Sequence, residues 1–454
     1  MIETKKKINL MFASAVGTTL EWYDFFIFAA CSVLVFDKQF FAASDPFLAT
    51  LLALGTFAVG FIARPLGGIV FGVVGDRIGR KRLLVISLIA MGVGTFVIGL
   101  LPTYSSIGVA APILLVVLRI VQGIAVGGEA TGAILIVAES MPAAQRAFWT
   151  SFTMLAGPAA NVLAAGAIGA IQVTYGNEAF VAWAWRIPFF LSGLLVLLGF
   201  WTRRQVEESA AFLELAARPD KVARAPLREA FSYHSKEMAQ TFFVKAAENT
   251  LLYLFSTFLL LMATKFLGFS RSQALNALLW GSALEVFVIL VAAHLSDRVG
   301  RRPIILVGLL SSIASGFGLF TLAPGSSYAQ LQFAVALCLA SHGVILGAMA
   351  AYLSELFPTW VRYTGLSTSY QLASVLGGSI APIVGTVLLE KTGANLSVAF
   401  YAAAIACPAL IWVYLAPETR GREFSSDKRG PQQDQYPQEI AQQPTSRTHE
   451  PARG

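Results

Sequence analysis

Apolar stretches long enough to cross a bilayer recur along this chain, separated by short polar intervals. They run over residues 9–36, 50–75, 82–101, 110–138, 147–171, 184–203, 239–264, 273–295, 303–323, 329–353, 363–389 and 397–416. A transmembrane α-helix needs roughly 20 predominantly apolar residues. The pattern therefore predicts an all-α membrane protein with twelve transmembrane helices.

The composition agrees with this pattern and excludes a water-soluble globule. Hydrophobic residues make up 56% of the 454 positions and charged residues only 13%, whereas an ordinary soluble domain has roughly 25% charged residues. The three cysteines, Cys31, Cys338 and Cys407, each lie in an apolar stretch without a second ligand at metal-binding spacing. We therefore expect no disulfide framework, no metal site and no cofactor.

A long polar interval divides the twelve stretches six and six. This interval, residues 203–237, is the longest before the C-terminal tail. We expect an N-terminal six-helix bundle at 1–204, a cytoplasmic linker with a short surface helix at 205–238, and a C-terminal six-helix bundle at 239–416. The remainder, 417–454, is rich in Gln, Pro, Arg and Ser with almost no apolar periodicity, which is typical of a disordered tail.

The distribution of basic residues predicts the orientation. The N-terminal segment, the tail and every second interval hold 25 of the 33 Lys and Arg residues, whereas the alternate intervals hold 4. Cytoplasmic loops of membrane proteins carry an excess of Lys and Arg. We therefore expect both termini on the cytoplasmic side of the cell inner membrane, and we interpret the net charge of +7 as a topology signal with no link to nucleic acid.

Two landmarks recur between the halves at nearly the same spacing. The string Asp76-Arg77-Ile78-Gly79-Arg80 returns 221 positions later as Asp297-Arg298-Val299-Gly300-Arg301. Glu139, Pro142 and Arg146 return 216 positions later as Glu355, Pro358 and Arg362. Because all these landmarks lie in intervals assigned to the cytoplasm, the halves have the same orientation. This is the arrangement of parallel repeats about an axis normal to the membrane.

Several strings resemble the major facilitator superfamily and, within it, the metabolite:proton symporter family. They are Gly72–Lys81, Glu21–Phe25, Arg64–Gly68, Trp185–Phe189, Ser354–Pro358, Val361–Gly365 and Pro417–Gly421. The resemblance covers nearly all of residues 9–420. It implies a proton-coupled symporter that works by alternating access, with a small-molecule substrate, protons and the lipid bilayer as partners, and we expect a monomer.

The resemblance also implies a gate that holds the outward-facing state closed on the cytoplasmic side. Its expected residues are those of the repeated landmarks: Asp76, Arg77, Arg80, Asp297, Arg298, Arg301, Glu139, Arg146, Glu355 and Arg362. Interpreting them as topology markers accounts for the basic residues but leaves the repeated aspartates unexplained.

Carboxylates inside the predicted spans are candidates for carrying the proton, because a charge at the bilayer centre costs roughly 2.5–3.5 kcal/mol on insertion scales. Glu21 and Asp24 lie three positions apart and share one face of the first helix. Two carboxylates this close in a low-dielectric cavity do not both ionise easily, which suits a proton carrier. Glu129 and Glu248 are further candidates. The structural alternative, an ion pair of Glu21 or Asp24 with Arg64 or Arg119, stays open.

Arg64 and Arg119 are the candidate anchors for an anionic substrate, because the planar guanidinium fork matches a carboxylate. Arg119 is preferred since Gln122 lies on nearly the same helix face. In the second half we expect the substrate to meet polar groups of Lys245, Asn249, Tyr253, Glu285 and His342. Two plainer interpretations stay open: Lys245 and Glu248 neutralise each other, and His342 is a packing residue.

The resemblance implies import of a small organic acid such as shikimate, a dicarboxylate, a tricarboxylate or an aromatic acid, and this inventory of charges is compatible with each of them. Zwitterionic osmolytes of the proline and betaine type are the alternative. Efflux of drugs or metabolites is a lesser alternative, because Ala159 and Ala160 follow Gly157-Pro158 where the exporter signature has glycines. The sequence has neither a His-Glu-x-x-His zinc helix nor a phosphate-binding loop, so we expect no enzyme.

Overall fold

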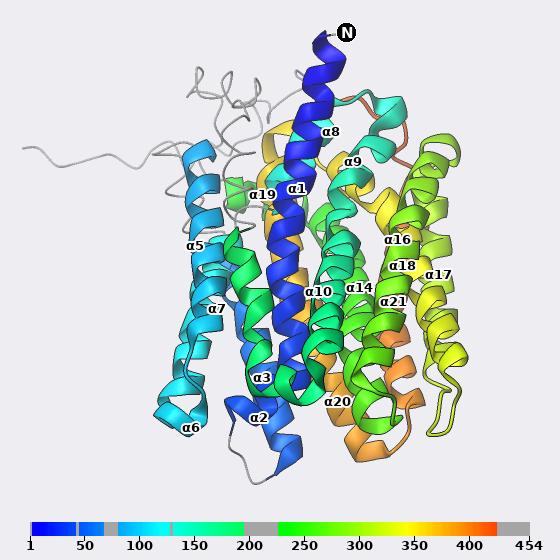
Figure 1. Ribbon diagram of the computed structural model, residues 1–454. Coiled ribbons are helices and arrows are strands. Elements are labelled where there is room, and N and C mark those ends of the chain that lie inside the picture. The colour runs from blue at the N-terminus through cyan, green and yellow to red at the C-terminus, as the bar shows by residue number, and fades with distance from the viewer. Residues whose placement is uncertain (1, 42–44, 68–79, 128–129, 195–225, 425–454) are drawn as a thin grey trace, which may run out of the picture.

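The computed structural model describes residues 2–41, 45–67, 80–127, 130–194 and 226–424 of the chain. In these ranges every regular element is a helix, and the helices stand side by side in one bundle (Figure 1). The all-α class expected from the apolar stretches is confirmed.

The first part of the chain contributes α1 (Ile2–Cys31), η1 (Ser32–Phe36), α2 (Asp37–Gln39), α3 (Pro46–Ile62), α5 (Arg80–Leu100), α6 (Tyr104–Ile107), α7 (Ala110–Val126), α8 (Ala130–Ser140), η2 (Ala143–Gln145), α9 (Arg146–Met154), α10 (Ala156–Ala179) and η3 (Phe180–Ala184). Residues 186–194 are also helical.

The second part contributes α13 (Pro226–Tyr233), α14 (Ser235–Tyr253), η5 (Leu254–Phe258), α15 (Leu259–Leu261), η6 (Met262–Phe266), α16 (Arg271–Val299), α17 (Arg301–Leu319), α18 (Tyr328–Leu356), α19 (Thr359–Ser374), η7 (Val375–Ile380), α20 (Ala381–Thr392) and α21 (Leu396–Leu415). The linker was expected to carry a short surface helix, and α13 lies there. Residues 205–225 of the linker and 425–454 of the tail are outside the described ranges.

Within the described ranges, ten helical segments are long and apolar enough to cross a membrane. They are Gly17–Gln39, Pro46–Gly67, Ala110–Ser140, Ala143–Ala184, Ser235–Phe266, Arg271–Val299, Arg301–Leu319, Tyr328–Leu356, Val361–Thr392 and Leu396–Leu415. The third predicted stretch forms a shorter apolar helix, Ile86–Leu100, and the sixth, 184–203, is described only in part. Twelve helices are consistent with this arrangement.

Side-chain caps explain where two of the long spans begin. The Ser270 and Ser327 hydroxyls accept hydrogen bonds from the backbone N–H groups of Gln273 and Gln330, whose side chains accept in return from the serine N–H groups. Such a capping box satisfies two N–H groups that a helix start otherwise leaves without partners. The local sequence therefore fixes the starts of α16 and α18.

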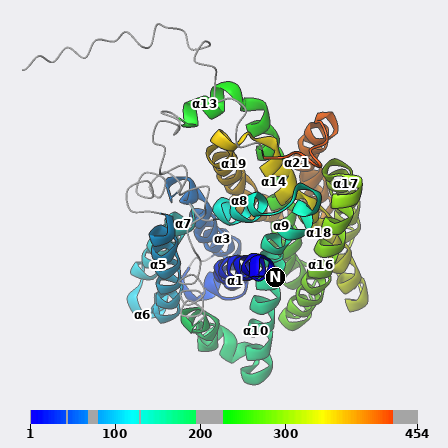
Figure 2. The same ribbon diagram turned by 90° about the horizontal axis from the view of Figure 1, so that it is seen from above.

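The helices of the two parts form separate groups that meet along a central boundary (Figure 2). Across it, α9 packs against α16 and α18, α10 packs against α16, and α3 packs against η7. The approach of α3 to η7 depends on Gly378, because a Cβ there would lie 2.6 Å from the Phe61 ring. Buried polar groups gather along this boundary.

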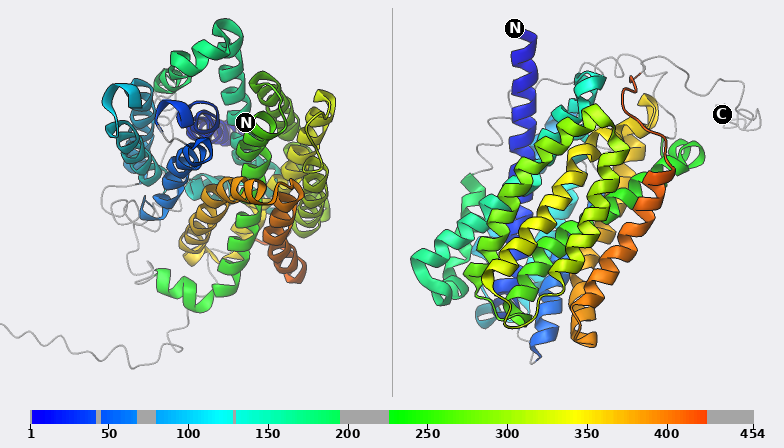
Figure 3. Two further views of the ribbon diagram at one scale, coloured as in Figure 1. Left: turned by 90° about the horizontal axis from the view of Figure 1, so that it is seen from below. Right: turned by 90° about the vertical axis from the view of Figure 1, so that its right-hand side faces the viewer.

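The start of α1 and residues 417–424 lie at the same end of the bundle (Figure 3). We call this end, where Arg146, Asp297, Arg301 and Glu355 gather, the charged end, and the other the opposite end. The first residues of the predicted tail are held by hydrogen bonds at the charged end, as described below. The disorder expected for the whole tail therefore does not extend to residues 417–424.

Candidate functional site

A chain of hydrogen bonds joins Arg119 on α7 to Asp24 on α1. Arg119 Nη1 donates to Gln122 Oε1 over 2.9 Å, and Gln122 Nε2 donates to Thr95 Oγ1 over 2.6 Å. The Thr95 hydroxyl lies 2.7 Å from Asp24 Oδ2, and the Ser192 hydroxyl donates to Asp24 Oδ1. The guanidinium and the carboxylate are thus connected through two neutral side chains. We call these five residues the arginine relay.

Arg119 is a buried cation that uses only some of its hydrogen-bond donors. Its exposed fraction is 1%, and within the described residues its Nε and Nη2 have no hydrogen-bond partner. The guanidinium carbon lies 3.9 Å from the Phe28 ring centre and 4.8 Å from that of Phe25, contacts that stabilise a cation through the aromatic face. Two buried donor nitrogens that take part in none of the hydrogen bonds above are an arrangement that favours an anionic ligand.

Arg64 lies against the same aromatic group. Its guanidinium carbon is 4.2 Å from the ring centres of both Phe25 and Phe61. Tyr253 reaches this group from the second half, with its ring 5.4 Å from that of Phe61, and the Tyr253 hydroxyl has no hydrogen-bond partner within the described residues. The structure therefore brings Arg64 and Tyr253 to one place, as expected of a shared site. Glu21 is buried one turn of α1 from Asp24.

Glycines leave the space that the relay occupies. A Cβ at Gly60 would lie 3.0 Å from Arg119 Nη2, and one at Gly123 would lie 2.2 Å from the Gly60 carbonyl oxygen. Since so short a distance is impossible, α3 and α7 approach each other only because both positions lack a side chain.

The second half carries a buried group of four charged or titratable side chains, which we call the histidine cluster. Lys245 Nζ lies 2.5 Å from Glu248 Oε2, so the pairing anticipated from their spacing is present. Glu248 Oε1 lies 3.4 Å from His342 Nε2, and His342 Nδ1 lies 2.5 Å from Glu285 Oε1. Asn249, one position along α14, is buried where Gly377 approaches it. His342 is therefore held between two carboxylates, which the packing interpretation did not anticipate.

A cavity of about 30 Å³ lies between the two halves beside the histidine cluster. Lys245, Glu248, His342 and Tyr370 line one part of it, and residues of the first half, including Trp22, line the rest. The Trp22 ring centre is 5.9 Å from the Arg64 guanidinium carbon. This volume holds roughly one water molecule beside the histidine cluster.

At the charged end, the repeated Glu and Arg landmarks pair across the boundary between the halves. Arg146 Nη1 lies 2.8 Å from Glu355 Oε1, and Arg362 Nη1 lies 3.0 Å from Glu139 Oε1. Each arginine therefore binds the glutamate of the other half. This exchange fits two parallel repeats related by a two-fold axis.

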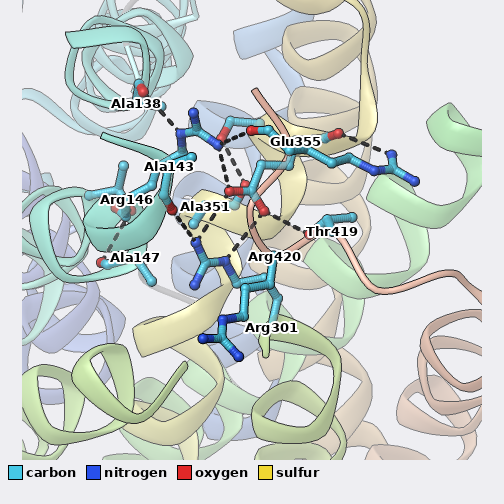
Figure 4. A network of polar contacts seen from close by, with 12 residues as sticks. Ala138, Ala143, Arg146, Ala147, Arg301, Ala351, Glu355, Thr419 and Arg420 are labelled. Carbon is cyan, nitrogen blue, oxygen red and sulfur yellow. Dashed lines mark hydrogen bonds and ion pairs between the residues drawn. The ribbon is translucent and has the colours of Figure 1, made fainter. Parts of the chain in front are cut away.

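Glu355 is the centre of this network (Figure 4). Arg301 Nε and Nη2 each lie 3.3 Å from its carboxylate oxygens, and the Thr419 hydroxyl donates to Oε2 over 2.7 Å. Asp297 makes a further contact between the halves, because its carboxylate accepts hydrogen bonds from the backbone N–H groups of Ala147 and Phe148 at the start of α9. A carboxylate at a helix N-terminus is stabilised by the free N–H groups and the helix dipole.

The segment after α21 closes over the same network. The Phe424 ring centre lies 3.8 Å from the guanidinium carbon of Arg146 and 3.7 Å from that of Arg362. Glu418 accepts from the backbone N–H groups of Arg301 and Arg302 at the start of α17. Its partial burial by itself raises its pKa, but hydrogen bonds from four backbone N–H groups outweigh that effect, so the pKa of Glu418 is lowered.

One ion pair at the opposite end was missed by sequence reasoning. Lys265 Nζ, in η6, lies 2.6 Å from Asp37 Oδ2 and 2.7 Å from Thr50 Oγ1, and so joins the two halves. A signal was available, because Asp37 and Lys265 follow the first span of each half and are opposite in charge.

Several expected site residues cannot be placed in this way. Asp76, Arg77 and Glu129 lie outside the described residues, as does the side chain of Arg80, which begins α5. Arg298 is exposed on α16. In the part of the chain that the structure describes, no group of three or more His, Cys, Asp or Glu residues is arranged to hold a metal ion.

The sequence matches the family described as Major Facilitator Superfamily over residues 14–359 and 241–447. The inner membrane metabolite transport protein YhjE of Escherichia coli (strain K12) is 39% identical over 426 residues, which cover 92% of this chain and 96% of that protein. The shikimate transporter of the same organism is 37% identical over 395 residues, covering 86% and 89%. The proline/betaine transporter of Salmonella typhimurium is 34% identical over 437 residues, covering 93% and 86%.

The fold has counterparts among solved structures. The crystal structure of a D-xylose-proton symporter superposes with a TM-score of 0.71 at 19% sequence identity, covering 91% of this chain and 99% of that one. At this identity the likeness concerns the fold alone.

Proposed function

Since this chain belongs to the Major Facilitator Superfamily and is a multi-pass membrane transporter, not an enzyme, we propose that it imports a small organic acid together with protons. The observation that carries the proposal is the arginine relay, in which a buried guanidinium with two donor nitrogens unpartnered within the described residues is connected by hydrogen bonds to a buried carboxylate. One end of the relay suits the acid and the other suits the proton.

Arg119 anchors the substrate carboxylate in this proposal. Its Nε and Nη2 donate to the two carboxylate oxygens, while Nη1 keeps its bond to Gln122. Arg64 and the Tyr253 hydroxyl lie on the same aromatic group and bind the rest of a polar solute. The relatives include a shikimate transporter, and a ring carrying one carboxylate and several hydroxyls meets this set of donors.

Asp24 carries the proton. When ionised, it accepts from the Thr95 and Ser192 hydroxyls. When protonated, it donates to Thr95, whose hydroxyl then turns to the Met91 carbonyl oxygen, 3.0 Å away. Because a hydroxyl has two acceptor lone pairs, Thr95 accepts from both Gln122 and Asp24 in that state. Both protonation states of Asp24 therefore keep every hydrogen bond between the relay residues.

The relay couples the two binding events through charge. An anion on Arg119 adds a negative charge near Asp24, which makes the neutral, protonated carboxyl more stable. By the reciprocity of linkage, a proton on Asp24 favours binding of the anion to the same extent. Glu21, one turn away, adds to the negative charge at this point. Proton and acid thus load together.

Alternating access follows from the networks at the two ends of the bundle. We place the charged end, with both termini, in the cytoplasm of the cell, since the basic residues gather there. The Arg146–Glu355 and Arg362–Glu139 ion pairs, together with the contacts of Asp297, then close the inner side. The ion pair of Lys265 with Asp37 closes the outer side. A single chain contains the whole path, so a monomer is sufficient. Rocking of the two halves around the midplane site opens one network at a time.

Two other functions are weighed against this one. A zwitterion of the proline or betaine type has a proline/betaine transporter among the relatives in its favour, and its cation would sit on the aromatic rings beside Glu21. Efflux of drugs or metabolites would not use Arg119 as an anchor for an anion. The substrate's net charge separates the first two, since only an anion depends chiefly on Arg119.

Uptake into proteoliposomes tests the proposal. Purified protein in liposomes with an inward proton gradient is expected to accumulate labelled shikimate, and a protonophore is expected to abolish the accumulation. Undiminished accumulation with the protonophore would overturn proton symport. Accumulation of labelled betaine with no binding of shikimate would favour the zwitterion function.

A further inference from the structure

His342 is buried on α18 between carboxylates from two other helices. Its Nδ1 lies 2.5 Å from Glu285 Oε1 on α16, and its Nε2 lies 3.4 Å from Glu248 Oε1 on α14. The exposed fractions of the three side chains are 0% for His342, 1% for Glu285 and 3% for Glu248. Bulk water therefore does not screen these contacts.

The two contacts of the imidazole differ in kind. We assign the proton of the neutral ring to Nδ1, because that atom is within hydrogen-bond distance of Glu285 Oε1. The lone pair of Nε2 then faces an oxygen of Glu248, and Nε2 has no hydrogen-bond partner within the described residues. Two acceptors that face each other repel. A proton on Nε2 converts this repulsion into a charge-assisted hydrogen bond.

The charges around the ring also favour the protonated imidazole. Lys245 contributes one positive charge, and Glu248 and Glu285 contribute two negative charges, so the cluster has a net charge of −1 with a neutral imidazole and zero with an imidazolium. Tyr253 of α14 and Tyr370 of α19 are neutral when protonated. Charged residues of the other helices packed on α18 are Arg301 and Arg302 of α17, Arg146 of α9, Glu139 of α8 and Arg362 of α19, and they lie at the charged end. Across the cavity from the cluster, Arg64 of the first half lies 5.9 Å from the ring centre of Trp22. An uncompensated charge within the buried cluster is costly.

We propose that His342 is a second proton-binding site of the transport cycle, in the C-terminal half, separate from Asp24; this rests on the proposed symport function. The cavity lined by His342, Glu248 and Lys245 supplies the proton. A hydronium ion there transfers H⁺ to the Nε2 lone pair, which forms one N–H bond and leaves one water molecule. The release is the reverse step. Wild-type protein accordingly moves two protons with each substrate, one in each half.

Nitrogen NMR of the histidine rings tests the site without any substrate. The chain has only four histidines, His234, His294, His342 and His449, so protein labelled with ¹⁵N-histidine in liposomes gives few signals, and His342→Gln assigns the one of interest. We expect Nε2 of His342 to gain and lose a proton as the pH is varied. Glu248→Gln should lower the ratio of protonated to neutral His342 at a given pH about tenfold or more, because a neighbouring opposite charge shifts this equilibrium by about one pKa unit or more.

A structural role predicts a different result. If His342 keeps one neutral tautomer at every pH, in wild type and in Glu248→Gln alike, the proposal is overturned. His294, on α16 and exposed, serves as the matched control, and His294→Gln should leave the His342 signals unchanged. Glu285→Gln retains an acceptor for Nδ1 and replaces Glu248→Gln if the latter does not fold.

The transport stoichiometry provides a second readout. In proteoliposomes with labelled shikimate, the membrane voltage that cancels a known substrate gradient gives the net charge moved with each substrate, which is the number of protons minus one because shikimate is a monoanion. We expect two protons, and hence one net positive charge, for wild type and His294→Gln. For His342→Gln we expect one proton and no net charge, so that no voltage cancels the gradient. A wild-type value of one proton that His342→Gln leaves unaltered would overturn the second site. Failure of wild type to move shikimate would count against the proposed function only, because the NMR result decides the proton site by itself.

Discussion

Arg146 and Glu355 form a buried ion pair of 2.8 Å across the boundary between the halves, although 209 positions separate them in the chain. Their repeat counterparts, Arg362 and Glu139, form the reciprocal pair at 3.0 Å. The two contacts exist only while the halves meet at the charged end. This end of the molecule therefore has a closed state that specific side chains stabilise, as a gate requires.

Asp24→Asn is expected to abolish uphill accumulation of shikimate while sparing exchange of labelled for unlabelled substrate. The amide keeps the bonds to Thr95 and Ser192 but cannot change its protonation. The measurement compares gradient-driven uptake with counterflow in the same proteoliposomes. Glu178→Gln, an exposed carboxylate, is the matched control. Accumulation by Asp24→Asn at the wild-type level would move the coupling role to another residue.

Arg119→Gln is expected to weaken binding of an acid more than binding of its amide. A hydrogen bond to a charged group contributes about 1.5–3 kcal/mol, so affinity for the acid should fall roughly 10- to 100-fold while that for the amide changes little. Displacement of labelled shikimate from purified protein by the acid and by its amide provides the two affinities. Lys391→Gln, an exposed cation, should change neither. Equal losses for acid and amide would contradict the role of an anion anchor.

Glu355→Gln is expected to open the charged end. Loss of one partner of a buried ion pair costs about 3–5 kcal/mol, and here two arginines lose the same partner. The population with the halves apart at this end should rise at least 100-fold, as measured by electron-spin distances between labels on α9 and α16. Glu423→Gln, an exposed carboxylate beside Phe424, is the control. An unchanged distance distribution in Glu355→Gln would show that the pair does not hold the gate.

Phe424→Ala is expected to have a smaller effect of the same kind. The ring lies between two guanidinium groups from different halves, and each such contact contributes about 0.5–1 kcal/mol at a partly exposed site. The open population should rise about 5- to 30-fold in the same spin-label measurement. Phe424→Trp keeps an aromatic face and should restore the wild-type distribution. If Phe424→Ala and Phe424→Trp give the same distance distribution, the aromatic ring does not stabilise the contact between the halves.

Glu418→Gln is expected to destabilise the protein at neutral pH and to lose this effect in acid. The lowered pKa of Glu418 means that its ionised form stabilises the folded state. This stabilisation is fully present above the ordinary value of 4.5 and disappears as the pH falls through the lower folded-state value. Thermal unfolding of both proteins at pH 7 and at a series of pH values that falls progressively below 4.5 is the measurement. A difference in melting temperature that persists in acid would contradict the linkage.

The spans were predictable because they depend on local composition. Apolar stretches separated by basic intervals identify membrane helices without reference to any partner. The break between α9 and α10 lies just before Gly157-Pro158 and was not anticipated, although proline is a local signal for such a break. The π-helical segments η5 and η7 were not anticipated either, and no local pattern of the sequence indicates them. The shared aromatic group under Arg64 and Arg119 was missed for the same reason.

By itself, the sequence determined the helices, their repeat and the inventory of buried charges, since hydropathy and spacing are properties of the chain alone. Only the tertiary structure decided which buried charges are in contact. Arg146 pairs with Glu355 and not with Glu139, and two carboxylates enclose His342. Asp24 is connected to Arg119 through Thr95 and Gln122. A buried charge needs a partner, but residues hundreds of positions apart become neighbours only when the helices pack. No local sequence pattern indicates which of them come into contact.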